Sequence, residues 1–308
     1  MVEFGGYGQW QTASSENRAR HFFRTGRAGQ TVAGMVWRAF EGVPRDCPPA
    51  VFVHGMGNDG NIWAAVVSEL LGLGPVLVVD LPGYGRSVRS ARGLTLELAI
   101  RGLSEVLRQE GISRPVNLIG HSLGGIVAAE WAAKFPSHVS RLLLVSAPPL
   151  TAIQMISEPS QIVRLPRSAL AMSGLVTTGL LPLSGRSISR IITSNLGRIV
   201  ALAPYAAHSR RLSPSPTRFA LNEIGGGNTQ LVVRSSRESR FESTISRIAC
   251  PIHLVRGSQD VLTTQLDFDA LAEWTDAVQH ETQDSGHLLP IERPAVISRL
   301  VAEQWDSS

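Results

Sequence analysis

The stretch from Val116 to Glu130 constrains the fold more than any other part of the chain; it reads Val-Asn-Leu-Ile-Gly-His-Ser-Leu-Gly-Gly-Ile-Val-Ala-Ala-Glu. A short apolar run ends at Gly120, and small and apolar residues typical of a helix follow Ser122. The five residues from Gly120 to Gly124 fit Gly-x-Ser-x-Gly, which between a strand and a helix holds a serine hydroxyl clear of the backbone. The glycines are required because a Cβ at either flank of so tight a turn would clash. We therefore predict Ser122 at a helix N-terminus, where free N–H groups favour developing negative charge.

Strand and helix patterns alternate along most of the chain. Apolar, β-branched runs predict buried strands at residues 50–54, 75–80, 116–119, 141–146 and 251–256. A shorter strand is expected at 277–282. Helical spacing predicts helices between them, at 62–71, 95–110, after Ser122, 265–274 and 294–304. Residues 31–40 are interpreted as one further strand, and residues 1–30 as a loose leader. This alternation predicts a parallel sheet with helices on both faces.

The alternation stops between residues 147 and 247. This interval holds apolar helical stretches broken by prolines, then a segment rich in Ser, Arg, Pro and Gly. We interpret it as a helical cap inserted into one α/β core domain that comprises residues 1–146 and 248–308. The most apolar part of the cap, Ala169–Leu183, is too short to span a bilayer. We expect it to pack on the main domain, and its apolar face is also a candidate wall for a substrate pocket.

Composition excludes several classes of protein. The 308 residues carry a net charge of +4, and nearly all the positive charge is arginine, since Lys134 is the only lysine. The arginines are scattered rather than clustered, which argues against a nucleic-acid partner. Two cysteines, Cys47 and Cys250, are too few for a disulfide framework or a structural zinc site. A polar N-terminus without a signal peptide and the absence of long apolar runs predict a cytoplasmic protein without a membrane span.

A serine hydroxyl becomes an effective nucleophile only when a base takes its proton and an acid orients that base. Asp260 is the candidate acid, because it follows the strand at 251–256 after a short turn. His287 is the candidate base, because it lies in a glycine-containing loop just before the last helix. The order Ser122, Asp260, His287 along the chain is the one expected for a serine site on a sheet of this kind.

The other histidines and a nearby carboxylate are weaker candidates. His253 and His280 fall inside predicted strands, where a partly buried structural histidine is the better interpretation. His121 is expected to pack or hydrogen-bond locally beside the nucleophile. Asp284 is close to His287 in sequence, and such a neighbour more often caps or turns its own loop.

Attack on a carbonyl also requires N–H donors for the oxyanion that forms. The backbone N–H of Leu123, directly after the nucleophile, is one candidate. The second is expected from the loop after the strand that ends at His54, and we assign it to the backbone N–H of Met56. In the alternative interpretation, His54-Gly55 is only the end of a strand that requires a glycine and has no role in binding the oxyanion.

A rival interpretation concerns the same loop. Residues 55–60, Gly-Met-Gly-Asn-Asp-Gly, match Gly-x-Gly-x-x-Gly between a strand and a helix, and Asp80 ends the next strand. This is the pattern of a dinucleotide site with its ribose-binding acid. A lone glycine pattern is weak, however, and this hypothesis leaves Ser122, Asp260 and His287 without a role.

Taken together, five motifs resemble the α/β-hydrolase superfamily: His54-Gly-Met56, Asp80-Leu-Pro-Gly-Tyr-Gly-Arg-Ser87, Gly120-His-Ser-Leu-Gly-Gly125, Gly257-Ser-Gln-Asp260 and Ser285-Gly-His287. They span about residues 30–304, with only the inserted segment lacking a motif. The resemblance implies a mostly parallel eight-stranded sheet with a cap after the sixth strand. It also implies Ser122 as nucleophile, His287 as base, Asp260 as orienting acid, and the amides of Met56 and Leu123 as oxyanion donors. A serine in the tight turn of the Gly-x-Ser-x-Gly motif disfavours the epoxide hydrolases and haloalkane dehalogenases, which carry an aspartate at that position.

The function expected from these motifs and the resemblance is hydrolysis of a carboxylic ester or thioester, or of a lactone, in a hydrophobic small molecule. The expected protein is a monomer or homodimer that needs no cofactor and no metal. Two alternatives from the same superfamily remain: a non-hydrolytic cyclase, lyase or lactone-forming enzyme of natural-product biosynthesis, and a C–C bond hydrolase. A ligand receptor on this fold is the non-enzymatic alternative.

Overall fold

The computed structural model describes residues 18–21, 24–25, 31–32, 36–40, 47–85, 87, 95–157, 171, 194–212 and 241–306. The strands are β1 (Arg18–His21), β2 (Arg24–Thr25), β3 (Thr31–Val32), β4 (Val36–Phe40), β5 (Ala50–Val53), β6 (Val76–Asp80), β7 (Val116–His121), β8 (Val139–Val145), β9 (Ile252–Gly257) and β10 (Val278–Thr282). The α-helices are α1 (Ala64–Leu70), α2 (Leu96–Gln109), α3 (Leu123–Lys134), α4 (Leu150–Ser157), α7 (Asn195–Leu202), α10 (Phe241–Ile245), α11 (Gln265–Trp274), α12 (Leu289–Glu292) and α13 (Pro294–Asp306). Two 3-10 helices complete the set, η3 (Gly60–Trp63) and η4 (Pro136–His138).

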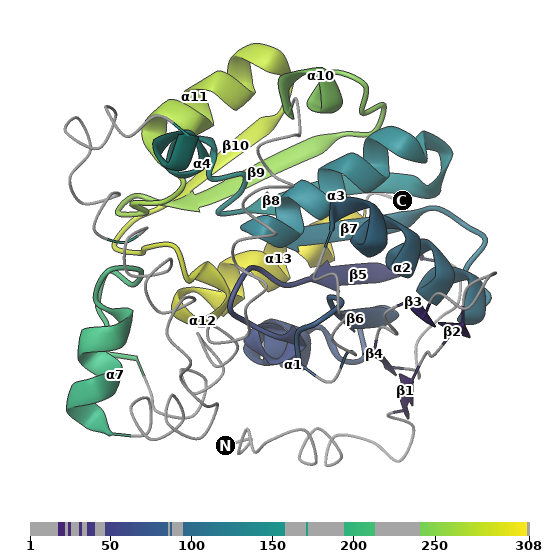
Figure 1. Cartoon of the computed structure of the whole chain (residues 1–308), viewed down its shortest axis with the longest axis horizontal. Coiled ribbons are helices and arrows are strands. Elements are labelled where there is room, and N and C mark those ends of the chain that lie inside the picture. The colour runs from purple at the N-terminus through teal and green to yellow at the C-terminus, as the bar shows by residue number, and fades with distance from the viewer. Residues whose placement is uncertain are drawn as a thin grey trace.

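Eight strands form one twisted sheet in the order β1-β4-β6-β5-β7-β8-β9-β10 (Figure 1). All pairs from β6 to β10 are parallel, whereas β4 pairs antiparallel with both β1 and β6. The mostly parallel, eight-stranded sheet predicted from the sequence is therefore confirmed. Because parallel strands all end at the same edge, the loops after β5, β7, β9 and β10 meet there.

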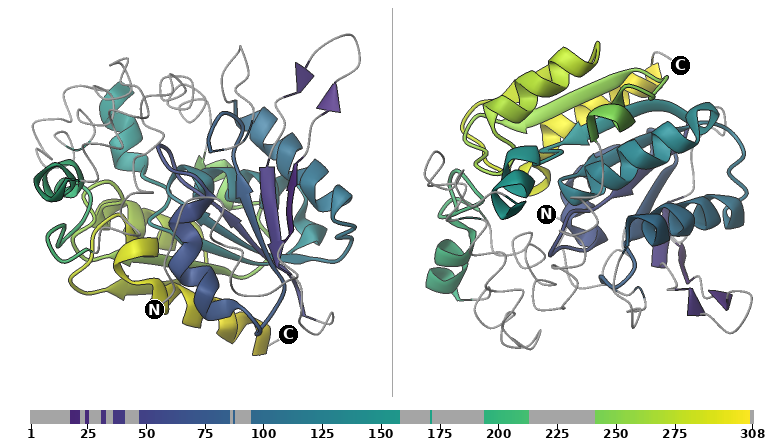
Figure 2. Two further views of the ribbon diagram at one scale, coloured as in Figure 1. Left: turned by 90° about the horizontal axis from the view of Figure 1, so that it is seen from below. Right: turned by 45° about the horizontal axis from the view of Figure 1, so that its top comes forward.

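Two apolar layers cover the two faces of the sheet. The alternation along β5 divides it, with Val51 and Val53 in one buried cluster and Ala50 and Phe52 in the other. The first cluster includes residues of α2, α3 and α11, and the second includes residues of α1, α12 and α13. Helices on both sides of the sheet are visible in Figure 2. Strands buried on both faces explain the continuous apolar runs in the sequence.

Two predictions for the N-terminal part of the chain are wrong. Residues 31–40 do not form one strand: β3 pairs with β2 in a separate two-stranded sheet, and β4 joins the main sheet. Residues 1–30 are not merely a leader, since β1 pairs antiparallel with β4. Strands of two to five residues carry too little periodicity to be recognised, and their pairing partners are chosen only in three dimensions.

The predicted cap lies mostly outside the described residues, and so does most of the apolar segment Ala169–Leu183. Within the interval 147–247 the structure describes α4, Ala171, α7 with the turn after it, and α10. The extent of the cap stays a prediction. Among the described residues, no helix is both long enough and apolar enough to cross a membrane.

Candidate active site

Ser122 occupies the turn between β7 and α3 with φ 51° and ψ −118°, a backbone conformation that non-glycine residues rarely adopt. The surrounding chain holds it there through close backbone contacts. A Cβ added to Gly120 would lie 2.4 Å from the carbonyl oxygen of Gly124, and one added to Gly124 would lie 2.4 Å from the carbonyl oxygens of Val53 and His54. The glycines of the motif are therefore required by sterics, because β5, β7 and α3 approach one another at backbone distance.

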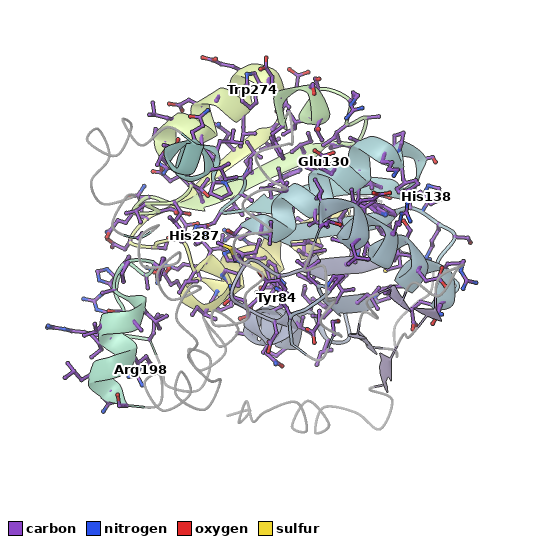
Figure 3. All side chains as sticks on the ribbon, viewed as in Figure 1. Tyr84, Glu130, His138, Arg198, Trp274 and His287 are labelled. Atoms are coloured by element: carbon purple, nitrogen blue, oxygen red, sulfur yellow. The ribbon has the colours of Figure 1, made fainter. Side chains whose placement is uncertain are left out.

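The side chains of Ser122, His287 and Asp260 form a continuous hydrogen-bonded chain. The Ser122 Oγ lies 3.0 Å from Nε2 of His287, and the other ring nitrogen, Nδ1, lies 3.0 Å from both carboxylate oxygens of Asp260. All three side chains are buried, and His287 lies beside α12 in Figure 3. The structure thus brings together three residues that are separated by up to 165 positions in the sequence.

The environment of Asp260 keeps its carboxylate ionised. Burial raises the pKa of this group, but the nearby His287 and the backbone N–H groups of Leu262 and Thr263 outweigh burial, so the pKa is lowered. Both amides donate to Oδ1 at 2.9 Å. An ionised Asp260 favours a proton on Nδ1 of His287, which leaves Nε2 free to accept the proton of Ser122.

The two predicted oxyanion donors lie on segments that touch the nucleophile. Leu123 is the first residue of α3, where the backbone N–H has no acceptor within its own helix. The loop after β5 passes directly beside Ser122, since a Cβ added to Gly55 would lie 3.0 Å from the Ser122 Cβ. The N–H of Met56 belongs to the peptide that follows Gly55. The position of both segments agrees with the predicted roles of Leu123 and Met56, which stay predictions.

The glycine-rich loop at residues 55–60, which also matches the pattern of a dinucleotide site, makes a structural contact with Asp80. The Asp80 carboxylate accepts the backbone N–H of Gly60 at 2.8 Å, so it anchors the end of that loop to β6. Among the described residues, no group of three or more His, Cys, Asp or Glu side chains is arranged to hold a metal ion.

Of the residues judged weaker in the sequence, His253, His280 and Asp284 make their side-chain contacts outside this chain of hydrogen bonds. His253 and His280 stack on each other across β9 and β10, with Nδ1 and Nε2 3.2 Å apart. The exposed Asp284 contacts Gln259 through its carboxylate. His121 has a larger role than local packing, as described below.

A family model described as the alpha/beta hydrolase family matches residues 50–300, which is most of the chain. The chain belongs to this family. An uncharacterised protein of Mycobacterium tuberculosis is 29% identical over 221 residues, 70% of this chain and 62% of that protein. The chain therefore spans less than two thirds of that relative's length. A pimeloyl-[acyl-carrier protein] methyl ester esterase of Chromobacterium violaceum is 27% identical over 84% of this chain and 95% of that enzyme.

Solved structures show the same fold. A thermophilic esterase from Thermogutta terrifontis superposes with a TM-score of 0.67 at 18% identity, over 94% of this chain and 98% of that one. This likeness concerns the arrangement of the sheet and helices.

The sequence analysis did not identify two residues that hold the loop of His287. Nε2 of His121 lies 2.9 Å from the carbonyl oxygen of His287. Burial, and to a smaller extent the nearby His287, lowers the pKa of His121 to about 3. His121 is therefore neutral, so its Nε2–H donates to that carbonyl. Glu292 accepts the N–H groups of Gly286 and Leu288 at 3.0 and 3.1 Å.

Sequence offered little signal for either residue. His121 and the His287 carbonyl are 166 positions apart, so only the fold brings them into contact. Glu292 is the last residue of the short helix α12, whose other residues are apolar, and a lone carboxylate there is expected to need buried partners. Burial raises its pKa against the lowering effect of its backbone donors.

Proposed function

We propose that this protein is a serine hydrolase that cleaves a carboxylic ester or thioester of a hydrophobic small molecule through an acyl-enzyme. The observation that carries the proposal is the unbroken Ser122–His287–Asp260 hydrogen-bonded chain, with 3.0 Å between each pair of contacting atoms. The similarity to a protein named a methyl ester esterase supports an ester as the bond attacked.

In the proposed reaction, His287 Nε2 removes the proton of Ser122 as Oγ attacks the acyl carbon. Asp260 stabilises the imidazolium that forms and keeps the ring in orientation. The negative charge on the former carbonyl oxygen is stabilised by the backbone N–H groups of Leu123 and Met56. His287 then gives its proton to the leaving alcohol or thiol, and a water that it activates releases the acyl group from Ser122.

The hydrophobic character of the substrate is inferred from the apolar composition of the predicted cap. Ala169–Leu183 contains a single polar cluster, Thr177-Thr178, apart from Ser173 and glycines. Because the rest of this segment is aliphatic, we expect the acyl group to be apolar and medium to large.

The test is replacement of Ser122 by alanine, assayed against a panel of acyl esters, thioesters and lactones by mass spectrometry. We expect the rate on any substrate turned over by the wild type to fall by about 10⁴- to 10⁶-fold, since the nucleophile is lost. Ser68→Ala is the matched control, because Ser68 lies on α1 and donates to the Ala65 carbonyl. Wild-type turnover by Ser122→Ala would exclude the acyl-enzyme route.

Water labelled with ¹⁸O separates hydrolysis from the non-hydrolytic alternatives. A hydrolase incorporates one labelled oxygen into the released acid, because water attacks the acyl-enzyme. A cyclase or lyase that uses the same side chains only to move protons forms its product without the label. An unlabelled product from the natural substrate would replace the proposal by that alternative.

A further inference from the structure

The helix α7, in the predicted cap, buries a charged residue and exposes apolar ones. Arg198 is only 5% exposed, and Leu202, one turn later on the same face, is completely buried. Leu196 and Val200, which are also one turn apart, are 74% and 63% exposed. An amphipathic helix normally has the opposite arrangement, with its apolar stripe toward the core and its charges in water. The inward position of Arg198 therefore requires a stabilising partner.

Two nitrogens of the Arg198 guanidinium, Nε and Nη1, are fully buried and have no hydrogen-bond partner among the described residues. A guanidinium stays positively charged in proteins and only donates hydrogen bonds, so burying it is strongly unfavourable unless acceptors or an anion meet it. Its donors form a rigid planar fork that matches the oxygens of a carboxylate or a phosphate. The group that suits this position is therefore an oxyanion.

The buried face of α7 continues directly to the loop of the proposed catalytic base. Leu202 belongs to the same apolar cluster as Leu288, the residue after His287. Tyr205, in the turn that follows α7, accepts the backbone N–H of His287 through its carbonyl oxygen at 2.7 Å. Arg198 precedes Leu202 by one turn, about 6 Å along the helix axis. Figure 3 labels Arg198 on α7 and His287 beside α12. This separation suits a substrate group several bonds away from the reacting carbonyl.

We propose that Arg198 binds an oxyanion of the substrate, a carboxylate or a phosphate, at the end remote from the scissile bond. This inference rests on the proposed hydrolase function and narrows its substrates to apolar esters or thioesters that carry a negative charge. A neutral ester would leave the buried guanidinium without a partner, so the contact discriminates between charged and neutral substrates. Arg198 thus determines specificity and takes no part in the bond-breaking step.

Replacement of Arg198 by methionine tests whether the guanidinium has its partner within the protein. Methionine is flexible and apolar, so it can fill the space of the arginine stem without burying a charge. We expect Arg198→Met to keep or raise the urea midpoint of the ligand-free protein, because an unpaired buried charge is removed. Loss of an arginine that pairs with a carboxylate of the protein would lower the midpoint instead. A lowered midpoint therefore overturns the proposal.

Two matched pairs of esters test the preference for charge. Monomethyl octanedioate and methyl octanoate differ by a carboxylate on the acyl side, whereas octanoylglycerol phosphate and octanoylglycerol differ by a phosphate on the alcohol side. In one of these pairs we expect the wild-type kcat/KM to favour the charged ester by about 10- to 100-fold, the range for hydrogen bonds to a charged group. Arg198→Met is expected to lose this preference through a higher KM for the charged ester.

Arg210→Gln is the matched control, because Arg210 is exposed in the turn after α7 and changes the net charge equally. It is expected to keep the wild-type preference. The proposal is overturned if the wild type favours the neutral ester in both pairs, or if Arg198→Met retains the preference of the wild type.

Failure of the hydrolase function is recognised separately, since no ester of either pair would then be cleaved in a way that depends on Ser122. Binding to Ser122→Ala tests Arg198 without any turnover. Monomethyl octanedioate or octanoylglycerol phosphate is expected to raise the melting temperature of Ser122→Ala, because a ligand that binds only the folded state stabilises it. The same ester is expected to have no effect on the double variant with Arg198→Met. Equal shifts in both proteins, or a shift in neither, would contradict the assignment of Arg198.

Discussion

At the residue scale, the carboxylate of Asp260 derives its proposed role from three atoms around it: two backbone nitrogens and Nδ1 of the His287 ring. Oδ1 is held by the amides of Leu262 and Thr263, so its position is set before His287 is considered. Both oxygens then face Nδ1 of His287 at 3.0 Å. Replacing Asp260 by asparagine keeps the shape of this side chain but changes which nitrogen of the His287 ring carries the proton.

Asp260→Asn is expected to lower kcat by about 10³- to 10⁴-fold. The two amides would hold the asparagine oxygen, which leaves its NH₂ group facing Nδ1 and places the histidine proton on Nε2, where it blocks proton transfer from Ser122. Steady-state kinetics on an ester substrate measure this loss. Asp284→Asn serves as the control, since this exposed carboxylate contacts only Gln259 among the partners described.

Asp260→Asn with the wild-type kcat, or Asp284→Asn with an equal loss, would contradict the assignment. In the second case the acid that orients His287 would have to be sought in its own loop.

At the scale of elements, α11 is joined to α4, the first helix of the predicted cap, by one buried carboxylate. Asp267 on α11 accepts the N–H and hydroxyl of Thr151 at 2.7 and 2.5 Å, and the N–H of Thr264 at 2.7 Å. With Thr264 it also forms the capping box that begins α11. The same group therefore starts one helix and anchors another.

This carboxylate predicts an unusual pH dependence of stability. Burial raises the pKa of Asp267 to about 6, and its hydrogen bonds from Thr151 and Thr264 only partly oppose that rise. Between its ordinary pKa near 4 and about 6, the folded state binds a proton that the unfolded state has released. The contribution of Asp267 to stability is therefore greatest in acid and is lost as the pH rises through that window, by on the order of 2–3 kcal/mol.

Urea denaturation of the wild type and Asp267→Asn at pH 4.5 and pH 7.5 checks this prediction. The difference in unfolding free energy between the two proteins removes the contribution of the other titrating groups. We expect the wild type to compare more favourably with the variant at pH 4.5 than at pH 7.5. A constant difference would show that Asp267 titrates in the folded state as it does in the unfolded chain, and a reversed one that folding lowers its pKa; both contradict the prediction.

At the scale of the whole molecule, Trp305 in α13 ties the C-terminal helix to the segments that precede β5 and β6. Its Nε1 donates to the Pro48 carbonyl at 2.8 Å, just before β5, across 257 positions of sequence. Its ring packs so tightly on Gly74 that a Cβ there would lie 2.5 Å from it. The indole therefore holds the last helix against the entrances of two central strands, β5 and β6.

Trp305→Ala is expected to reduce the free energy of unfolding by about 3–5 kcal/mol, because it opens a cavity and leaves the Pro48 carbonyl without its donor. Trp274→Ala is the matched control: Trp274 is half-buried at the end of α11, far from His287 in Figure 3, and should cost less. Urea midpoints at unchanged slope measure both. Equal losses of unfolding free energy would mean that Trp305 contributes no more to stability than a half-buried tryptophan such as Trp274.

The sequence alone determined the central sheet, because strands buried on both faces must be continuously apolar and the helices between them must show a 3.6-residue period. It also predicted which residues come together: Ser122, Asp260 and His287 each follow a predicted strand, and parallel strands end at one edge. The helix at 265–274 was predicted with the bounds that the structure shows.

Only the tertiary structure decided the rest. The short strands β1 to β3 are defined by their partners, and two to four residues hold too little pattern to predict a partner. His54, His121 and Glu292 make their contacts with backbone groups, which every residue carries and no side-chain sequence reveals. Sequence thus identifies the groups that react, whereas the contacts that aim them depend on where the folded chain places its own amides and carbonyls.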